Sequence, residues 1–152
     1  DFALDAKGQR LGLALSEIPA QRTRDIYDRE KRKETEPERA WNCAALFDLK
    51  EGKVLRTVHG HRGVVSSVGV SPDGETLASG GWDKRVLLHR DGVVDELKFG
   101  WSVRRVRFSP DGRYLLIGAW TPQNPIGDKK SDLSALMIEL GYGENAHIVA
   151  PP

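Results

Sequence analysis

Residues 71–82 read Ser-Pro-Asp-Gly-Glu-Thr-Leu-Ala-Ser-Gly-Gly-Trp, and residues 109–120 read Ser-Pro-Asp-Gly-Arg-Tyr-Leu-Leu-Ile-Gly-Ala-Trp. Both the Ser-Pro-Asp-Gly turn and the closing tryptophan therefore recur after 38 residues. Because proline fixes φ and glycine supplies a positive φ, these four residues predict a tight turn. Apolar residues alternate before each turn and a second β-like run follows it, so each copy is a predicted β-hairpin.

A weaker third copy of the hairpin stands at the N-terminus. Residues 5–8 (Asp-Ala-Lys-Gly) replace the turn, with apolar residues before them and a β-like run at 11–15 after them. Regular strand pattern resumes only at 44–49, so the polar stretch at about 17–42 is a predicted insertion. In the last unit, residues 121–132 form a second predicted insertion at the same place.

Each unit adds two further short strands to its hairpin. Four short strands in a unit of roughly 40 residues is the pattern of a β-propeller blade. The sequence therefore predicts an all-β protein made of four-stranded antiparallel blades. We expect a degenerate blade at 1–58, the best-defined blade at 59–99 and a third blade at 100–152.

The middle unit resembles a WD repeat. The residues that carry this resemblance are Gly60-His61, Ser71-Pro72-Asp73-Gly74, Leu77-Ala78-Ser79-Gly80-Gly81, Asp83 and Val86-Leu87-Leu88. In that family a His, a Ser or Thr, an Asp and a Trp form a hydrogen-bonded structural network. The resemblance implies this role for His61, Ser79 and Asp83, whereas His89 stands where the family has its Trp.

About three blades are present, whereas a closed propeller typically has four to eight. Since each blade buries its faces against two neighbours, three alone leave apolar faces and strand edges open. We therefore expect the propeller to be incomplete in this chain, with its remaining blades supplied by further sequence or by another subunit. A pairing of two copies, which would provide about six blades, is the alternative.

Composition and charge narrow the function classes. Lys and Arg number 23 against 22 Asp and Glu, so the net charge of +1 offers no whole-chain field for nucleic acid or an anionic membrane. No apolar run is long enough to span a membrane. The single cysteine, Cys43, allows no intrachain disulfide and is compatible with a reducing compartment, so we take the cytoplasm as the expected location.

No catalytic, cofactor-binding or metal-binding constellation is evident in the sequence. His59 and His61 are two residues apart, but no cysteine or carboxylate completes a zinc ligand set at a suitable spacing. Cys43 has no His partner, and Ser71 and Ser109 belong to repeat turns and not to nucleophile elbows. We therefore expect a protein that is not an enzyme and that uses neither a cofactor nor a metal.

Both insertions follow the second strand of their blades, and such loops emerge on one face of a propeller. This face would gather all four tryptophans, Trp41, Trp82, Trp101 and Trp120. They either anchor a protein partner, as tryptophans do at interface hot spots, or pack against the insertions. The first insertion carries the basic residues Arg29, Lys31, Arg32 and Lys33, whose acidic neighbours favour a solvated or partner-bound segment over a nucleic-acid site.

Three arginines, Arg104, Arg105 and Arg107, lie on a predicted inner strand, where alternation points the last two the same way. Structural pairing is the favoured interpretation and an anion site the alternative. The function expected from these observations is a non-catalytic scaffold for protein–protein interaction within a multisubunit assembly. The alternative function is that of a propeller domain or accessory subunit of a larger hydrolase or redox enzyme.

Overall fold

The computed structural model describes residues 1–16, 42–120, 133–140 and 148–149. In these ranges the chain forms twelve strands in three four-stranded antiparallel sheets, and none of the described residues is helical. The predicted all-β class and the four-stranded antiparallel blades are confirmed. The first insertion, except Asn42, and the whole of the second lie outside the described residues.

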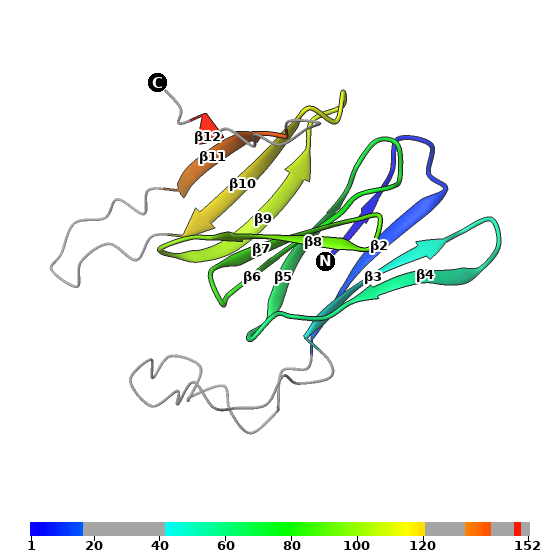
Figure 1. The fold of residues 1–152 in the computed structure, drawn as a ribbon, viewed down its shortest axis with the longest axis horizontal. Coiled ribbons are helices and arrows are strands. Elements are labelled where there is room, and N and C mark those ends of the chain that lie inside the picture. Colours follow the sequence, from blue (N-terminus) through cyan, green and yellow to red (C-terminus); the bar gives the residue numbers. More distant parts are fainter. Residues whose placement is uncertain (17–41, 121–132, 141–147, 150–152) are drawn as a thin grey trace, which may run out of the picture.

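The sheets follow one another along the chain. The first sheet contains β1 (Phe2–Leu4), β2 (Arg10–Leu15), β3 (Cys43–Asp48) and β4 (Lys53–Val58). The middle sheet contains β5 (Val65–Val70), β6 (Leu77–Gly81), β7 (Arg85–Arg90) and β8 (Val93–Lys98). The third sheet contains β9 (Ser102–Phe108), β10 (Tyr114–Trp120), β11 (Leu133–Glu139) and β12 (Ile148–Val149). Strands adjacent in sequence are adjacent in each sheet, and the middle sheet lies between the other two (Figure 1).

Side chains at the start of each hairpin turn bind the backbone beyond it. Ser71 Oγ accepts a hydrogen bond of 2.8 Å from the Thr76 amide, and Ser109 makes the equivalent bond in the third sheet. In the first sheet Asp5 Oδ1 takes this place, because it accepts from the Arg10 amide, also five residues on, at 3.0 Å. The degenerate turn therefore keeps the geometry of the other two with a carboxylate in place of a hydroxyl.

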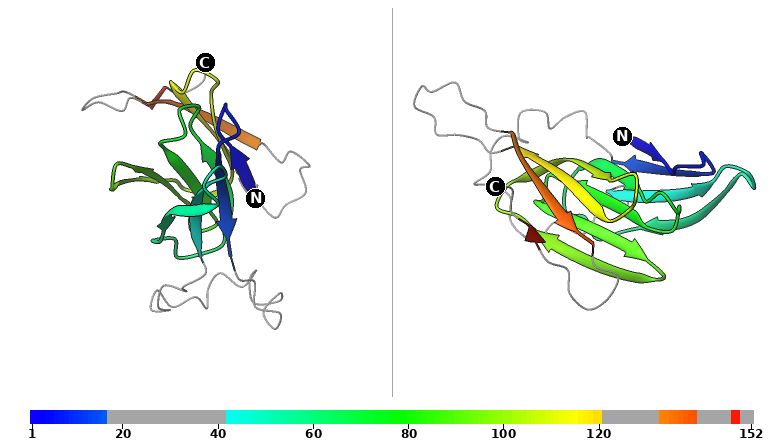
Figure 2. Two further views of the ribbon diagram at one scale, coloured as in Figure 1. Left: turned by 90° about the vertical axis from the view of Figure 1, so that its right-hand side faces the viewer. Right: turned by 90° about the horizontal axis from the view of Figure 1, so that it is seen from above.

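Two apolar clusters hold the middle sheet against its neighbours. One joins β3 and β4 to β5 and β6, and the other joins β6 and β7 to the third sheet. The close approach of the middle and third sheets depends on Gly80, since a Cβ at this position would lie 2.5 Å from Val103 Cγ1. The view from above shows the same succession of sheets, with the middle one between the other two (Figure 2).

The outer faces of the first and third sheets carry exposed apolar side chains. Phe2, which is 64% exposed, and Leu4 alternate along β1 with Ala3, which packs toward the middle sheet. On the third sheet Leu116 and its cross-strand partner Met137 are exposed as well. A propeller buries such faces between neighbouring blades, so the three described sheets fit an incomplete propeller.

Candidate protein-interaction site

A buried polar network stabilises the end of the middle sheet. His61 is 1% exposed, and its Nδ1 lies 3.0 and 3.1 Å from the two carboxylate oxygens of Asp83. Its Nε2 lies 2.9 Å from Ser79 Oγ. Because a carboxylate can only accept, Nδ1 donates to Asp83; in the neutral imidazole, Nε2 then accepts from the Ser79 hydroxyl. The structure thus brings together the three residues that the resemblance assigned to a network.

This network fixes the loop before β5 against the turn between β6 and β7. The Arg62 amide donates to Asp83 Oδ2 at 2.8 Å, and the Trp82 amide donates to the Val64 carbonyl at 2.9 Å. Space for the imidazole comes from Gly81, where a Cβ would lie 2.8 Å from His61 Nδ1. These hydrogen bonds fix the position of Trp82 in the turn.

His89 occupies the position at which the WD-repeat resemblance expects a tryptophan. It is 7% exposed, and its Nε2 has no hydrogen-bond partner among the residues the structure describes. Burial, with smaller contributions from His61 and Arg56, lowers the pKa of His89 from its ordinary 6.5 to about 4. The side chain is therefore a neutral imidazole at physiological pH.

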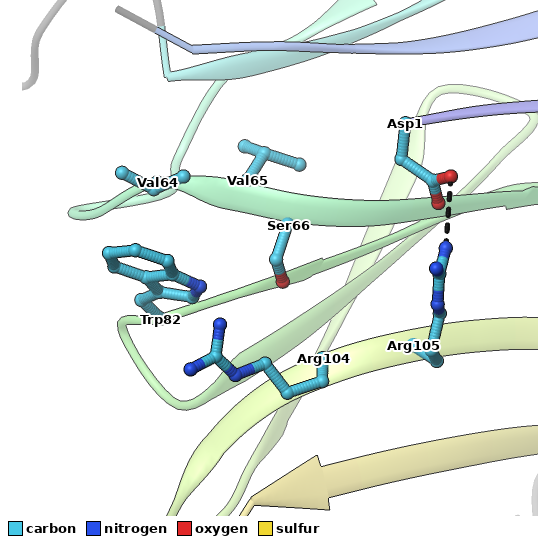
Figure 3. Close-up of a pocket in the computed structure, with 7 residues that line it drawn as sticks. All are labelled: Asp1, Val64, Val65, Ser66, Trp82, Arg104 and Arg105. Carbon is cyan, nitrogen blue, oxygen red and sulfur yellow. Dashed lines mark hydrogen bonds and ion pairs between the residues drawn. The ribbon is translucent and has the colours of Figure 1, made fainter. Parts of the chain in front are cut away.

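An open groove of about 580 Å³ lies where the middle and third sheets meet (Figure 3). Its lining comes from the start of β5, the turn between β6 and β7, the start of β9 and the residue before β1. The lining residues are Asp1, Val64, Val65, Ser66, Trp82, Arg104 and Arg105. Aromatic, aliphatic and charged groups thus share one surface depression.

Two β-bulges supply side chains to this groove. In the middle sheet Val65 pairs with Gly81 and Ser67 with Gly80, which leaves Ser66 as the extra residue. In the third sheet the register shifts in the same way around Arg104. A bulge takes its extra side chain out of the normal alternation, and this is how both residues come to face the groove.

The guanidinium of Arg104 lies against the indole of Trp82. Its Cζ is 5.1 Å from the ring centroid, within the range of a cation–π contact. Beside this pair, the Ser66 hydroxyl lies 2.6 Å from the carbonyl oxygen of Val103, which joins the two sheets at the groove floor. The Trp82 Nε1 is buried and has no acceptor in the described part of the chain.

Asp1 bridges the inner strands of all three sheets. Its carboxylate accepts a hydrogen bond of 2.8 Å from Ser67 Oγ and contacts Arg105 Nη1 at 3.2 Å and Arg107 Nη1 at 3.4 Å. Arg107 also donates to the Val68 carbonyl at 2.6 Å. Arg105 and Arg107 therefore point the same way and pair with a carboxylate, as structural arginines do.

The described residues that flank both insertions adjoin the groove. Ser16, the last described residue before the first insertion, accepts a hydrogen bond of 2.8 Å from the Val65 amide through its Oγ. Trp120, the last before the second insertion, pairs with Ser102, whose hydroxyl donates to the Trp82 carbonyl at 3.2 Å. The connections to both insertions therefore begin beside the same depression.

The remaining predicted contact residues are placed less fully. Trp101 lies just before β9 and is 41% exposed, whereas the side chain of Trp120 is not described. The residues outside the described ranges are Trp41, Arg29, Lys31, Arg32 and Lys33. Sequence reasoning did not single out Ser66 or Asp1, since neither a bulge nor a contact between separate blades leaves a local signal in the sequence.

The described ranges show no metal-binding cluster and no reactive thiol. They hold no group of three or more His, Cys, Asp or Glu side chains that could bind a metal ion. None of their elements is a helix long and apolar enough to cross a membrane. Burial raises the pKa of the Cys43 thiol, which disfavours the reactive thiolate.

Successive four-stranded antiparallel sheets packed face to face are the blades of a β-propeller. Residues 52–90 match the family model of the WD40 repeat, described as "WD domain, G-beta repeat". The chain therefore contains a WD40 repeat, and its sheets have the β-propeller fold. The matched repeat runs from β4 of the first sheet through β7 of the middle sheet, so one repeat links two blades covalently.

Two curated proteins and one solved structure illustrate the similarity. Periodic tryptophan protein 2 homolog of Schizosaccharomyces pombe is 35% identical over 78 residues, which is 49% of this chain and 9% of that protein. Eukaryotic translation initiation factor 3 subunit I of Phaeosphaeria nodorum is 39% identical over 72 residues, 45% of this chain and 22% of that protein. The β-propeller domain of Myceliophteria thermophila Cps50 (Swd1) matches 97% of this chain and 38% of its own length, with a TM-score of 0.59 and 16% identity. The chain thus spans only a small part of the relatives it matches.

Proposed function

We propose that this chain is a non-catalytic scaffold that contacts a protein partner through the face bearing the groove. The observation that carries the proposal is the position of Trp82 and Arg104, which line the groove beside the residues that flank both insertions. Tryptophan and arginine are the residue types most enriched among energetically dominant interface contacts.

The two insertions also favour the groove-bearing face as the one that contacts a partner. A regular blade needs neither of them, so the extra sequence is more readily explained by recognition than by core packing. A propeller also presents its loops on a rigid frame, and therefore loses little conformational entropy when a partner binds. Within this proposal Trp101, Trp120, Trp41 and the basic residues Arg29, Lys31, Arg32 and Lys33 remain candidate contacts.

A subunit role is consistent with the relatives. Eukaryotic translation initiation factor 3 subunit I is, by its name, one subunit of a larger factor. We propose that this chain likewise works within a multisubunit assembly, and that its exposed outer sheet faces pack against further blades. Those blades would come from a longer form of the same protein or from another subunit.

The direct test is a structure of the full-length protein in the assembly with which it is purified. We expect the partner to cover Trp82 and Arg104 and to contact residues of both insertions. If every partner contact instead lies at the opposite end of the strands, at the Ser-Pro-Asp-Gly turns, the proposed face is wrong.

A further inference from the structure

We propose that the groove beside Trp82 binds an acidic protein segment. The segment would bring a carboxylate to the guanidinium groups of Arg104 and Arg105, and an apolar side chain to Val64 and the indole. This inference rests on the proposed scaffold function and adds the chemistry of the partner.

The first argument is the balance of charge around the groove. Arg104 and Arg105 line it, and both are exposed. Two cationic side chains therefore line one depression, which favours an anionic ligand both in binding and in the rate of encounter.

Two carboxylates among the described residues, those of Asp83 and Asp1, are engaged within the protein. Asp83 is buried and binds His61 and the Arg62 amide. Asp1 is bound by Ser67 and by two arginines of β9. Both of these carboxylates are therefore held in fixed internal contacts.

The second argument is that the two arginines of the groove are already held in position to bind a carboxylate. Arg105 already binds one, that of Asp1, at 3.2 Å (Figure 3). Arg104 is held on the face of Trp82 at 5.1 Å, so less side-chain freedom is lost when a ligand oxygen binds it.

The third argument concerns why the ligand of the groove would be a protein segment and not a nucleic acid. Val64 and the Trp82 ring, both partly exposed, supply apolar area beside the charged groups, which suits a peptide that alternates acidic and apolar side chains. A nucleic acid binds through a long run of phosphate contacts, and the whole chain has a net charge of only +1. The local chemistry therefore favours a carboxylate-bearing peptide.

Fluorescence anisotropy with the full-length protein tests the inference. The probes are a fluorescein-labelled peptide of sequence Glu-Leu-Asp-Phe-Glu-Leu, the same peptide with Gln and Asn in place of the acids, and a labelled thymidine 12-mer. The variants are Arg104→Gln, Trp82→Leu and Lys7→Gln, the last a matched cation at the exposed turn between β1 and β2. Circular dichroism checks that each variant is folded.

We expect the acidic peptide to bind at least about tenfold more tightly than its amide counterpart, with weakening as salt rises. Arg104→Gln and Trp82→Leu should each weaken it by about fivefold or more, and Lys7→Gln should not. Equal binding of the two peptides, no binding up to about 1 mM, or tighter binding of the oligonucleotide would overturn the inference. If the purified assembly still depends on Trp82 in that case, the scaffold function stands and only the acidic partner is wrong.

Discussion

Ser66 and Arg104 occupy equivalent positions in successive blades, 38 residues apart, and each is the extra residue of a β-bulge. The Ser66 hydroxyl joins the floor of the groove to β9, and Arg104 packs on Trp82 at its wall. Because both bulges lie at the same height in adjoining sheets, they open one depression between them. The repeat thus places the two bulges next to each other, and the residue at each bulge supplies a polar group to the groove.

Removal of the indole should weaken partner binding more than folding. We expect Trp82→Ala to cost on the order of 2 kcal/mol in the binding free energy measured by calorimetry with the purified partner. The unfolding free energy should fall less, because Trp82 is only half-buried. Lys7→Ala, at the opposite end of the strands, is the control, and an equal loss of binding in that variant would argue against a specific anchor.

His61 should serve stability. His61→Ala leaves the buried Asp83 carboxylate and the Ser79 hydroxyl without their partner. We expect a loss of roughly 1–3 kcal/mol in the free energy of unfolding, measured by urea denaturation. Unchanged stability together with loss of a measurable reaction would show that the residue has a chemical role instead.

Close packing of the middle and third sheets should not tolerate a methyl group at Gly80. A Cβ there meets Val103 Cγ1 at 2.5 Å and Val106 Cγ1 at 3.0 Å, so Gly80→Ala should destabilise the protein by about 1–3 kcal/mol. The matched control is Gly100→Ala, because no atom lies within 4 Å of a Cβ at that position. Equal melting temperatures for the two variants would mean that the sheets can shift apart without cost.

Acid should destabilise the middle sheet through His89. Its pKa is about 4 in the folded protein, below the ordinary 6.5, so the unfolded chain binds the proton first as pH falls. The contribution of the neutral His89 imidazole to the free energy of unfolding is therefore complete above about pH 6.5. It is lost between pH 6.5 and 4, by an amount on the order of 2–3 kcal/mol. Urea denaturation at several pH values measures this slope.

Replacement of the imidazole isolates its share of the pH dependence. His89→Phe, which copies Phe47 at the equivalent position of the first sheet, should flatten the stability profile between pH 4 and 6.5. His59→Gln removes an exposed imidazole as a control and should leave the profile as it is. A profile that is equally steep in His89→Phe would assign the acid sensitivity to other groups.

The strands could be predicted well from the sequence because their signals are local. Alternating apolar residues and the Ser-Pro-Asp-Gly turns defined both hairpins of the better-matched units, and even the degenerate turn at Asp5 was recognised by its glycine. The groove could not be predicted in the same way. Its two bulge residues, Ser66 and Arg104, read in sequence as ordinary members of alternating strands.

Periodicity and turn chemistry are properties of neighbouring residues, and they suffice for the all-β class, the four-stranded blades and the repeat family. The contacts of Asp1 with Ser67, Arg105 and Arg107 join residues that are far apart along the chain. Such contacts exist only once the sheets have packed, because packing decides which side chains share a surface. The tertiary structure therefore decided where charge, indole and bulge meet, and with it where a partner would bind.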